Sequence, residues 1–181
     1  MIATFQLHRV LREAVATPYR NLVTRSTGAA VRGRIEAALA DSGSHTAVLD
    51  FSEVACLDFS CADEIVAKLL LASAEPGRVV VLRGLHDDLR DAIEHVLIHH
   101  KLACAAWLPG GEAALLGWAS EDARTAFAAL LRAGERGAAT AAELAAQLDW
   151  AAERADAALA DLERHRLVRR TDAGFEPLAL P

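Results

Sequence analysis

The chain has 181 residues, of which 53% are apolar, and its formal net charge at neutral pH is −6. This apolar content is sufficient for a buried core, so extensive disorder is not expected. The acidic excess disfavours non-specific binding to nucleic acid or to anionic lipid. The sequence has neither a long uncharged apolar run nor a hydrophobic signal core, which predicts a cytoplasmic protein with no membrane partner.

Three cysteines, Cys56, Cys61 and Cys104, form an odd set without a Cys-x-x-Cys pair. Buried thiols are therefore expected rather than disulfides or a structural zinc site. His95 and His99 are four residues apart on one predicted helix, a spacing that can bind a metal ion. Because no third ligand is spaced to complete the site, neither a metal nor a cofactor is predicted.

Strands and helices are predicted to alternate over residues 1–118. Short apolar runs indicate strands, and apolar residues at helical spacing indicate helices between them. In chain order, the patterns predict strands at 1–11 and 22–25, a helix from Thr27, a strand at 47–51, a helix from about Ser60, a strand at 78–82, a helix at 86–102, and a hairpin of 103–108 and 113–118 around Pro109-Gly110-Gly111. This order predicts an α/β domain with a mixed sheet.

Beyond Ser120 the composition changes to alanine-rich helical sequence. Thr140 and Glu143 form a capping-box pattern at the start of one of these helices. The elements predicted here are helices at 121–133, 140–148 and 152–165, followed by a hairpin of 167–170 and 175–178. Their order and the spacing of their apolar residues resemble a winged helix-turn-helix domain over residues 121–181.

The most informative segment spans residues 47–71, where a strand, a polar turn and a helix follow one another. It reads Leu49-Asp50-Phe51-Ser52, then Val54, and then Ser60-Cys61-Ala62-Asp63-Glu64. These residues resemble the STAS domain of bacterial anti-sigma-factor antagonists, and more closely a STAS-like variant whose loop reads Ser-Phe-Ala-Asp-Glu. The resemblance implies a signalling partner, such as an anti-sigma-type ATPase or kinase, and a partner-binding loop of Asp58, Phe59, Ser60, Cys61, Asp63 and Glu64.

In the antagonists, the serine that falls on Ser60 is phosphorylated by the partner kinase, which makes Ser60 a candidate phosphoacceptor. A phosphate at a helix start would meet free N–H groups and the positive end of the helix dipole. Serine is also a common N-cap residue, and Asp58, Asp63 and Glu64 would repel an added phosphate. Both interpretations of Ser60 stay open at this point.

The C-terminal helices and hairpin also allow two functional interpretations, DNA binding and docking to protein. Residues 121–181 hold eight arginines against eleven aspartates and glutamates, a net charge of −3, which is unlike a strong DNA-binding domain. Arginines at the helix and the first hairpin strand are nevertheless placed where DNA phosphates could be contacted, namely Arg154, Arg166, Arg169 and Arg170. Docking to protein is the other interpretation.

The sequence lacks a Gly-x-Ser-x-Gly elbow, a Walker loop and a Rossmann glycine fingerprint, so no enzyme activity is predicted. It favours a non-enzymatic bacterial regulatory protein, in which the STAS-like domain binds a signalling partner and the winged helix relays its state. The alternative is a DNA-binding transcriptional regulator whose STAS-like domain senses a ligand or forms a homodimer.

Overall fold

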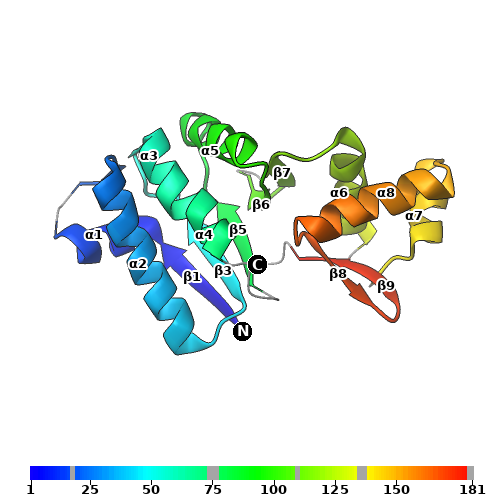
Figure 1. Cartoon of the computed structure of the whole chain (residues 1–181), viewed down its shortest axis with the longest axis horizontal. Coiled ribbons are helices and arrows are strands. Elements are labelled where there is room, and N and C mark those ends of the chain that lie inside the picture. The colour runs from blue at the N-terminus through cyan, green and yellow to red at the C-terminus, as the bar shows by residue number, and fades with distance from the viewer. Residues whose placement is uncertain (17–18, 73–77, 109–110, 134–137, 179–181) are drawn as a thin grey trace.

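A five-stranded sheet forms the centre of the N-terminal part of the chain (Figure 1). The computed structural model describes residues 1–16, 19–72, 78–108, 111–133 and 138–178. The strands of the sheet, in spatial order, are β1 (Ile2–Gln6), β3 (Thr46–Asp50), β5 (Val79–Arg83), β6 (Ala103–Trp107) and β7 (Ala113–Gly117). The first four are parallel and β7 is antiparallel to β6, so the sheet is mixed, as predicted.

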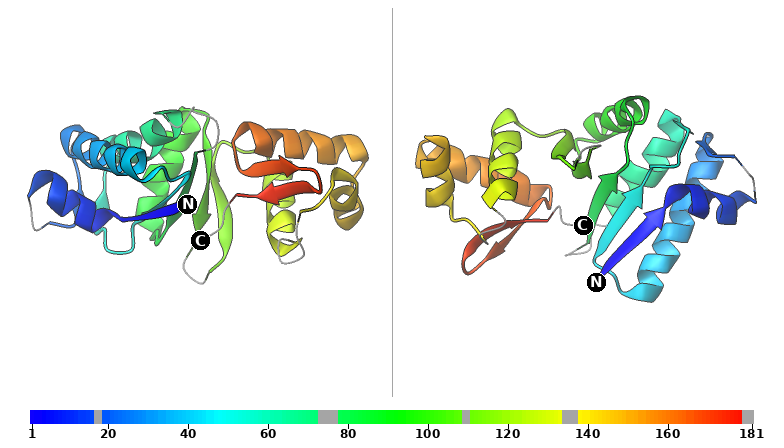
Figure 2. Two further views of the ribbon diagram at one scale, coloured as in Figure 1. Left: turned by 90° about the horizontal axis from the view of Figure 1, so that it is seen from below. Right: turned by 180° about the vertical axis from the view of Figure 1, so that it is seen from behind.

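Helices cover one face of this sheet (Figure 2). Alternate strand residues such as Leu49 and Leu82 turn to this face and pack with Ile35 and Ile93 of the helices. The helical segments are α1 (Leu7–Val15), α2 (Arg25–Ser42), α3 (Phe59–Ala62), the π-helical segment η1 (Asp63–Ala67), α4 (Lys68–Ala72) and α5 (Asp87–His99). Among the described residues, none of the helices combines the length and the apolar character needed to cross a bilayer.

The remaining elements lie beside β6 and β7 (Figure 1). The opposite sheet face contributes Ala105 and Leu115 to a second hydrophobic cluster, which also contains Phe127 and Leu159. These C-terminal elements are α6 (Glu121–Ala133), α7 (Ala141–Leu148), α8 (Ala152–Arg164), and a hairpin of β8 (Val168–Thr171) and β9 (Gly174–Pro177). They therefore share a hydrophobic core with the sheet.

Hydrogen bonds reinforce this junction. The guanidinium group of Arg124 in α6 donates to the main-chain carbonyls of Leu115 and Gly117 in β7. Ser120 donates through its hydroxyl to Asp161 of α8, at 3.1 Å. These bonds connect α6 to the sheet and connect the segment between β7 and α6 to α8.

Two predicted strands are wrong in part. Residues 7–11 belong to helix α1, because Leu7 and Leu11 lie one helical turn apart and both are fully buried. The strand expected at 22–25 is only β2 (Asn21–Leu22), which pairs with β4 (Cys56–Leu57) apart from the main sheet. Helix α2 begins at Arg25 rather than at Thr27, because the Thr24 hydroxyl caps it.

The other predicted elements are confirmed to within a few residues. The hairpin of β6 and β7 is present, although Pro109 and Gly110 of its predicted turn lie outside the described residues. The predicted capping box is also present: the Thr140 hydroxyl accepts from the Glu143 N–H, and the Glu143 carboxylate accepts from the Thr140 N–H.

Candidate functional site

The first part of the loop motif, Asp50 to Ser52, fixes a turn at the end of β3. The Asp50 carboxylate accepts from the N–H and the hydroxyl of Ser52, at 3.0 and 2.6 Å. Its other oxygen accepts from Arg83 of β5, at 2.8 and 3.0 Å. Burial raises the pKa of Asp50, but the bonds from Ser52 and Arg83 outweigh burial and leave it below its ordinary value.

Asp58 joins the starts of α2 and α3, which lie side by side at the carboxyl end of the parallel strands. Its carboxylate accepts from the N–H of Thr24 at 2.8 Å, from the N–H of Cys61 at 2.7 Å, and from the hydroxyl of Ser60 at 2.8 Å. Burial alone would raise the pKa of Asp58, but these bonds lower it overall. The carboxylate therefore stays ionised as an anchor for both helices.

Asp58, and not Ser60, is the N-cap residue of α3. The interpretation of Ser60 as the cap is wrong because the aspartate two residues earlier accepts the Cys61 N–H in its place. Ser60 lies within the first turn of α3 and donates its hydroxyl hydrogen to Asp58. A phosphate on Ser60 would bring its negative charge against that carboxylate.

We expect Asp58→Ala to lower the free energy of unfolding by about 2 kcal/mol, because it removes a cap and leaves two N–H donors unpaired. Ser60→Ala removes one bond to an anchored carboxylate and should cost only about 0.5–1 kcal/mol. Urea denaturation of both variants measures the difference. A larger loss for Ser60→Ala would contradict the assignment of the cap.

Glu64 lies inside a cluster of cations, with only 3% of its surface exposed. Its carboxylate accepts from Arg25 at 3.0 Å, from Arg32 at 3.3 Å, and also from Lys68. Burial raises the pKa of Glu64, but the bonds from Lys68 and Arg25 outweigh burial and hold it below its ordinary value. This buried charge is thus compensated from both α2 and α4.

Asp63 extends the cluster to α5. It accepts from Arg25 at 2.8 Å and forms a hydrogen bond of 2.7 Å with Nε2 of His100. Gly28 allows α2 to approach this closely, since a Cβ atom there would lie 2.9 Å from Cβ of Glu64. Asp63 and Glu64 also begin η1, a π-helical segment of a kind often found at functional sites.

The ionised carboxylates at this end of the sheet should make the stability of the folded protein depend on pH. Asp50, Asp58, Asp63 and Glu64 all have lowered pKa values in the folded protein. Their stabilisation is complete above the unfolded-state values of about 4 and is lost as the pH falls through the lower folded-state values. We expect the contribution of these four carboxylates to the free energy of unfolding to be level from about pH 7 to 5 and to fall below about pH 4.

Urea denaturation across this pH range measures the effect. Glu64→Gln removes one of the four groups, so its profile should fall less steeply below about pH 4 than that of the wild type. A wild-type protein that gains stability on acidification would contradict the charge assignments.

Phe59 is the exposed member of the predicted partner-binding loop. Its side chain is 58% exposed, and its ring centroid lies 4.8 Å from that of His95 on α5. Asp58, Ser60 and Asp63 are partly buried and bonded within the fold, and Cys61 is fully buried. The loop therefore presents an aromatic ring to solvent, while its polar groups hold the helices in place.

The three cysteines differ in their burial. Cys61 donates to the Thr24 carbonyl, and burial raises its pKa to about 12, so its thiol is a poor nucleophile. Cys104 is also buried, but Cys56 is exposed, contrary to the expectation of three buried thiols; all three are free. Within the described ranges, no cluster of three or more potential ligands is arranged to hold a metal ion.

Among the arginines proposed to contact DNA, Arg154, Arg169 and Arg170 form ion pairs with carboxylates. Arg154 binds Asp122 at 2.6 Å and lies over the ring of Trp150. Arg169 pairs with Glu176 at 2.6 Å, and Arg170 pairs with Glu163 at 3.2 Å. Arg166 lies half-buried in the turn after α8.

Acidic side chains accompany these pairs on α8, where Glu153 and Asp156 are exposed. Such a surface repels phosphates.

Comparison of the whole chain with models of protein families finds no match, and comparison with curated proteins finds none either.

Proposed function

We propose that the chain is a non-enzymatic regulatory protein whose N-terminal, STAS-like unit binds a protein partner around Phe59. The observation that carries this proposal is the exposure of Phe59 at the first residue of α3, among polar groups that are already bonded within the fold. Aromatic residues, phenylalanine included, are enriched in the cores of protein interfaces, so a ring that is held in place and open to solvent is suited to that role. The resemblance of residues 47–64 to the STAS-like family supports the same loop.

An anti-sigma-type ATPase or kinase is the class of partner that the resemblance implies, with Ser60 as its phosphoacceptor. Phosphorylation would add a charge of about −1.5 to −2. It would also break the hydrogen bond from Ser60 to Asp58, which anchors the starts of α2 and α3. The modification would therefore disturb the surface on which Phe59 lies and act as a switch of partner binding.

The C-terminal unit, which resembles a winged helix, would relay the bound state. Its core is continuous with the face of β6 and β7 opposite the helices, so the two units are mechanically connected. We favour a protein as its target, because α8 exposes Glu153 and Asp156 and because Arg154, Arg169 and Arg170 are already paired. DNA binding is the alternative.

A capture experiment with a matched pair of variants tests the proposed function. Phe59 and Leu71 are both exposed apolar residues, at opposite ends of the helical run from α3 to α4, roughly 18 Å apart. We expect Phe59→Ala to reduce capture of a native-host partner at least about tenfold, as for an interface hot spot, and Leu71→Ala to leave it unchanged. Circular dichroism should show both variants folded.

Equal capture by both variants would remove Phe59 from the interface.

Fluorescence anisotropy with host promoter fragments distinguishes the DNA-binding alternative from docking to protein. That alternative requires binding that falls by about 0.9 log units per log unit of salt for each phosphate contacted. It also requires a flatter slope after removal of Arg169 and Arg170.

A further inference from the structure

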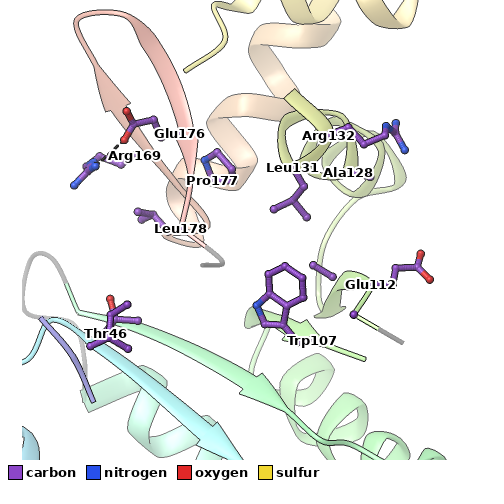
Figure 3. Close-up of a pocket in the computed structure, with 13 residues that line it drawn as sticks. Thr46, Trp107, Glu112, Ala128, Leu131, Arg132, Arg169, Glu176, Pro177 and Leu178 are labelled. Carbon is purple, nitrogen blue, oxygen red and sulfur yellow. Dashed lines mark hydrogen bonds and ion pairs between the residues drawn. The ribbon is translucent and has the colours of Figure 1, made fainter. Parts of the chain in front are cut away.

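A cavity of about 820 Å³ lies between the sheet and the C-terminal elements (Figure 3). Its floor is formed by residues of the sheet face opposite the helices, including Thr46 of β3 and Trp107 of β6. Its other wall is formed by Leu131 of α6 and by Pro177 and Leu178 at the end of the hairpin. The cavity is therefore built by segments far apart in the sequence.

The middle of this cavity is apolar. Figure 3 shows the side chain of Leu131 directed toward the indole ring of Trp107, with Pro177 and Leu178 on the same side as Leu131. A flat ring of another molecule could stack on an indole face in such a space. The volume is within the range of about 300–1,000 Å³ that is usual for pockets binding small molecules.

Charges at the two ends of the cavity are balanced. Arg169 and Glu176 lie at one end and form an ion pair of 2.6 Å. Arg132 and Glu112, also of opposite charge, lie at the other end. Neither end therefore presents a net charge, which disfavours a strongly ionic ligand and favours a neutral one.

We propose that this cavity binds a neutral, flat, largely aromatic small molecule, stacked on Trp107 and covered by Leu131. This binding site is independent of the protein-docking surface at Phe59. Because its walls come from both the sheet and the C-terminal elements, a bound ligand contacts both. Occupancy would therefore stabilise the arrangement in which the two parts share a core.

Nile red, a neutral and planar dye whose fluorescence rises in apolar surroundings, is a suitable probe. Two variants alter the cavity in opposite ways: Ala128→Trp fills it from α6, and Trp107→Ala removes its aromatic floor. Ala160→Trp places the same side chain on the exposed side of α8 and is the matched control. The full-length protein should bind one dye per chain, and the dye should raise the melting temperature in a concentration-dependent way.

We expect dye affinity to fall at least about tenfold in Ala128→Trp and in Trp107→Ala, and to be unchanged in Ala160→Trp. Melting curves show which variants are folded. If Trp107→Ala does not fold, the comparison of Ala128→Trp with Ala160→Trp alone tests the proposal. Equal dye binding by Ala128→Trp and Ala160→Trp would overturn the proposal. So would non-saturable binding, or tighter binding of the anionic dye 1-anilinonaphthalene-8-sulfonate than of Nile red.

Discussion

Glu64→Lys is expected to lower the free energy of unfolding by about 3–5 kcal/mol, enough to unfold much of the protein. The carboxylate is 3% exposed and accepts hydrogen bonds from Arg25, Arg32 and Lys68. A lysine in its place would bring a fourth cation into this cluster and remove its anion. Thermal and urea denaturation, followed by circular dichroism, measure the loss.

Glu53→Lys is the matched control for this charge reversal. Glu53 pairs with Arg20 at 2.9 Å, but both side chains are more than half exposed. Exposed ion pairs contribute little, so this variant should lose less than about 1 kcal/mol. Similar losses of unfolding free energy in the two variants would contradict the account of Glu64 as a buried anchor. If the expected difference is found, substitutions of Glu64 are unsuitable for probing partner contacts, because they unfold the protein.

Phe127→Ala is expected to cost about 3–5 kcal/mol, because it opens a cavity in a packed core. Phe127 is 1% exposed and belongs to the cluster that joins α6 to Ala105 and Leu115 of the sheet. Because both parts contribute to this cluster, the loss should lower the stability of the whole chain. Far-ultraviolet circular dichroism and tryptophan fluorescence should report one shared unfolding transition.

Phe59→Ala provides the comparison, since it truncates the same side chain where it is 58% exposed. Its loss should be within about 1 kcal/mol. If Phe127→Ala instead gave two separate transitions, with the sheet unaffected, the two parts would not share a core in solution.

Most strands and helices could be predicted because their apolar residues repeat with a clear period. Val79–Arg83 and Glu121–Ala133 are examples in which the pattern and the element agree closely. Helix α1 was missed because the loose alternation of Ile2, Phe5, Leu7 and Val10 fits a strand over residues 1–11 as well as a helix that begins at Leu7. Only packing in the folded core, where Leu7 and Leu11 are both buried, decides between them.

The helix start near Asp58 to Glu64 could be predicted from the sequence, but the hydrogen bonds that its residues form could not. Lys68 follows Glu64 by one helical turn, so this pair was a local signal available in the sequence. Arg25 and Arg32 are two turns apart on α2 and meet Glu64 only through tertiary packing. Asp58 caps α3 through the N–H of Cys61, a local bond, but its further bond from the N–H of Thr24 joins residues that are far apart in the sequence.

Site-specific photo-crosslinking tests the central claim most directly, because it reports contact with the partner rather than stability. A benzoylphenylalanine replaces Phe59 in one protein and Leu71 in another, and both are irradiated in the native host. The proposed docking surface predicts a discrete adduct with a second polypeptide from position 59 and none of that size from position 71. The absence of an adduct at position 59, or the same adducts from both positions, would contradict it.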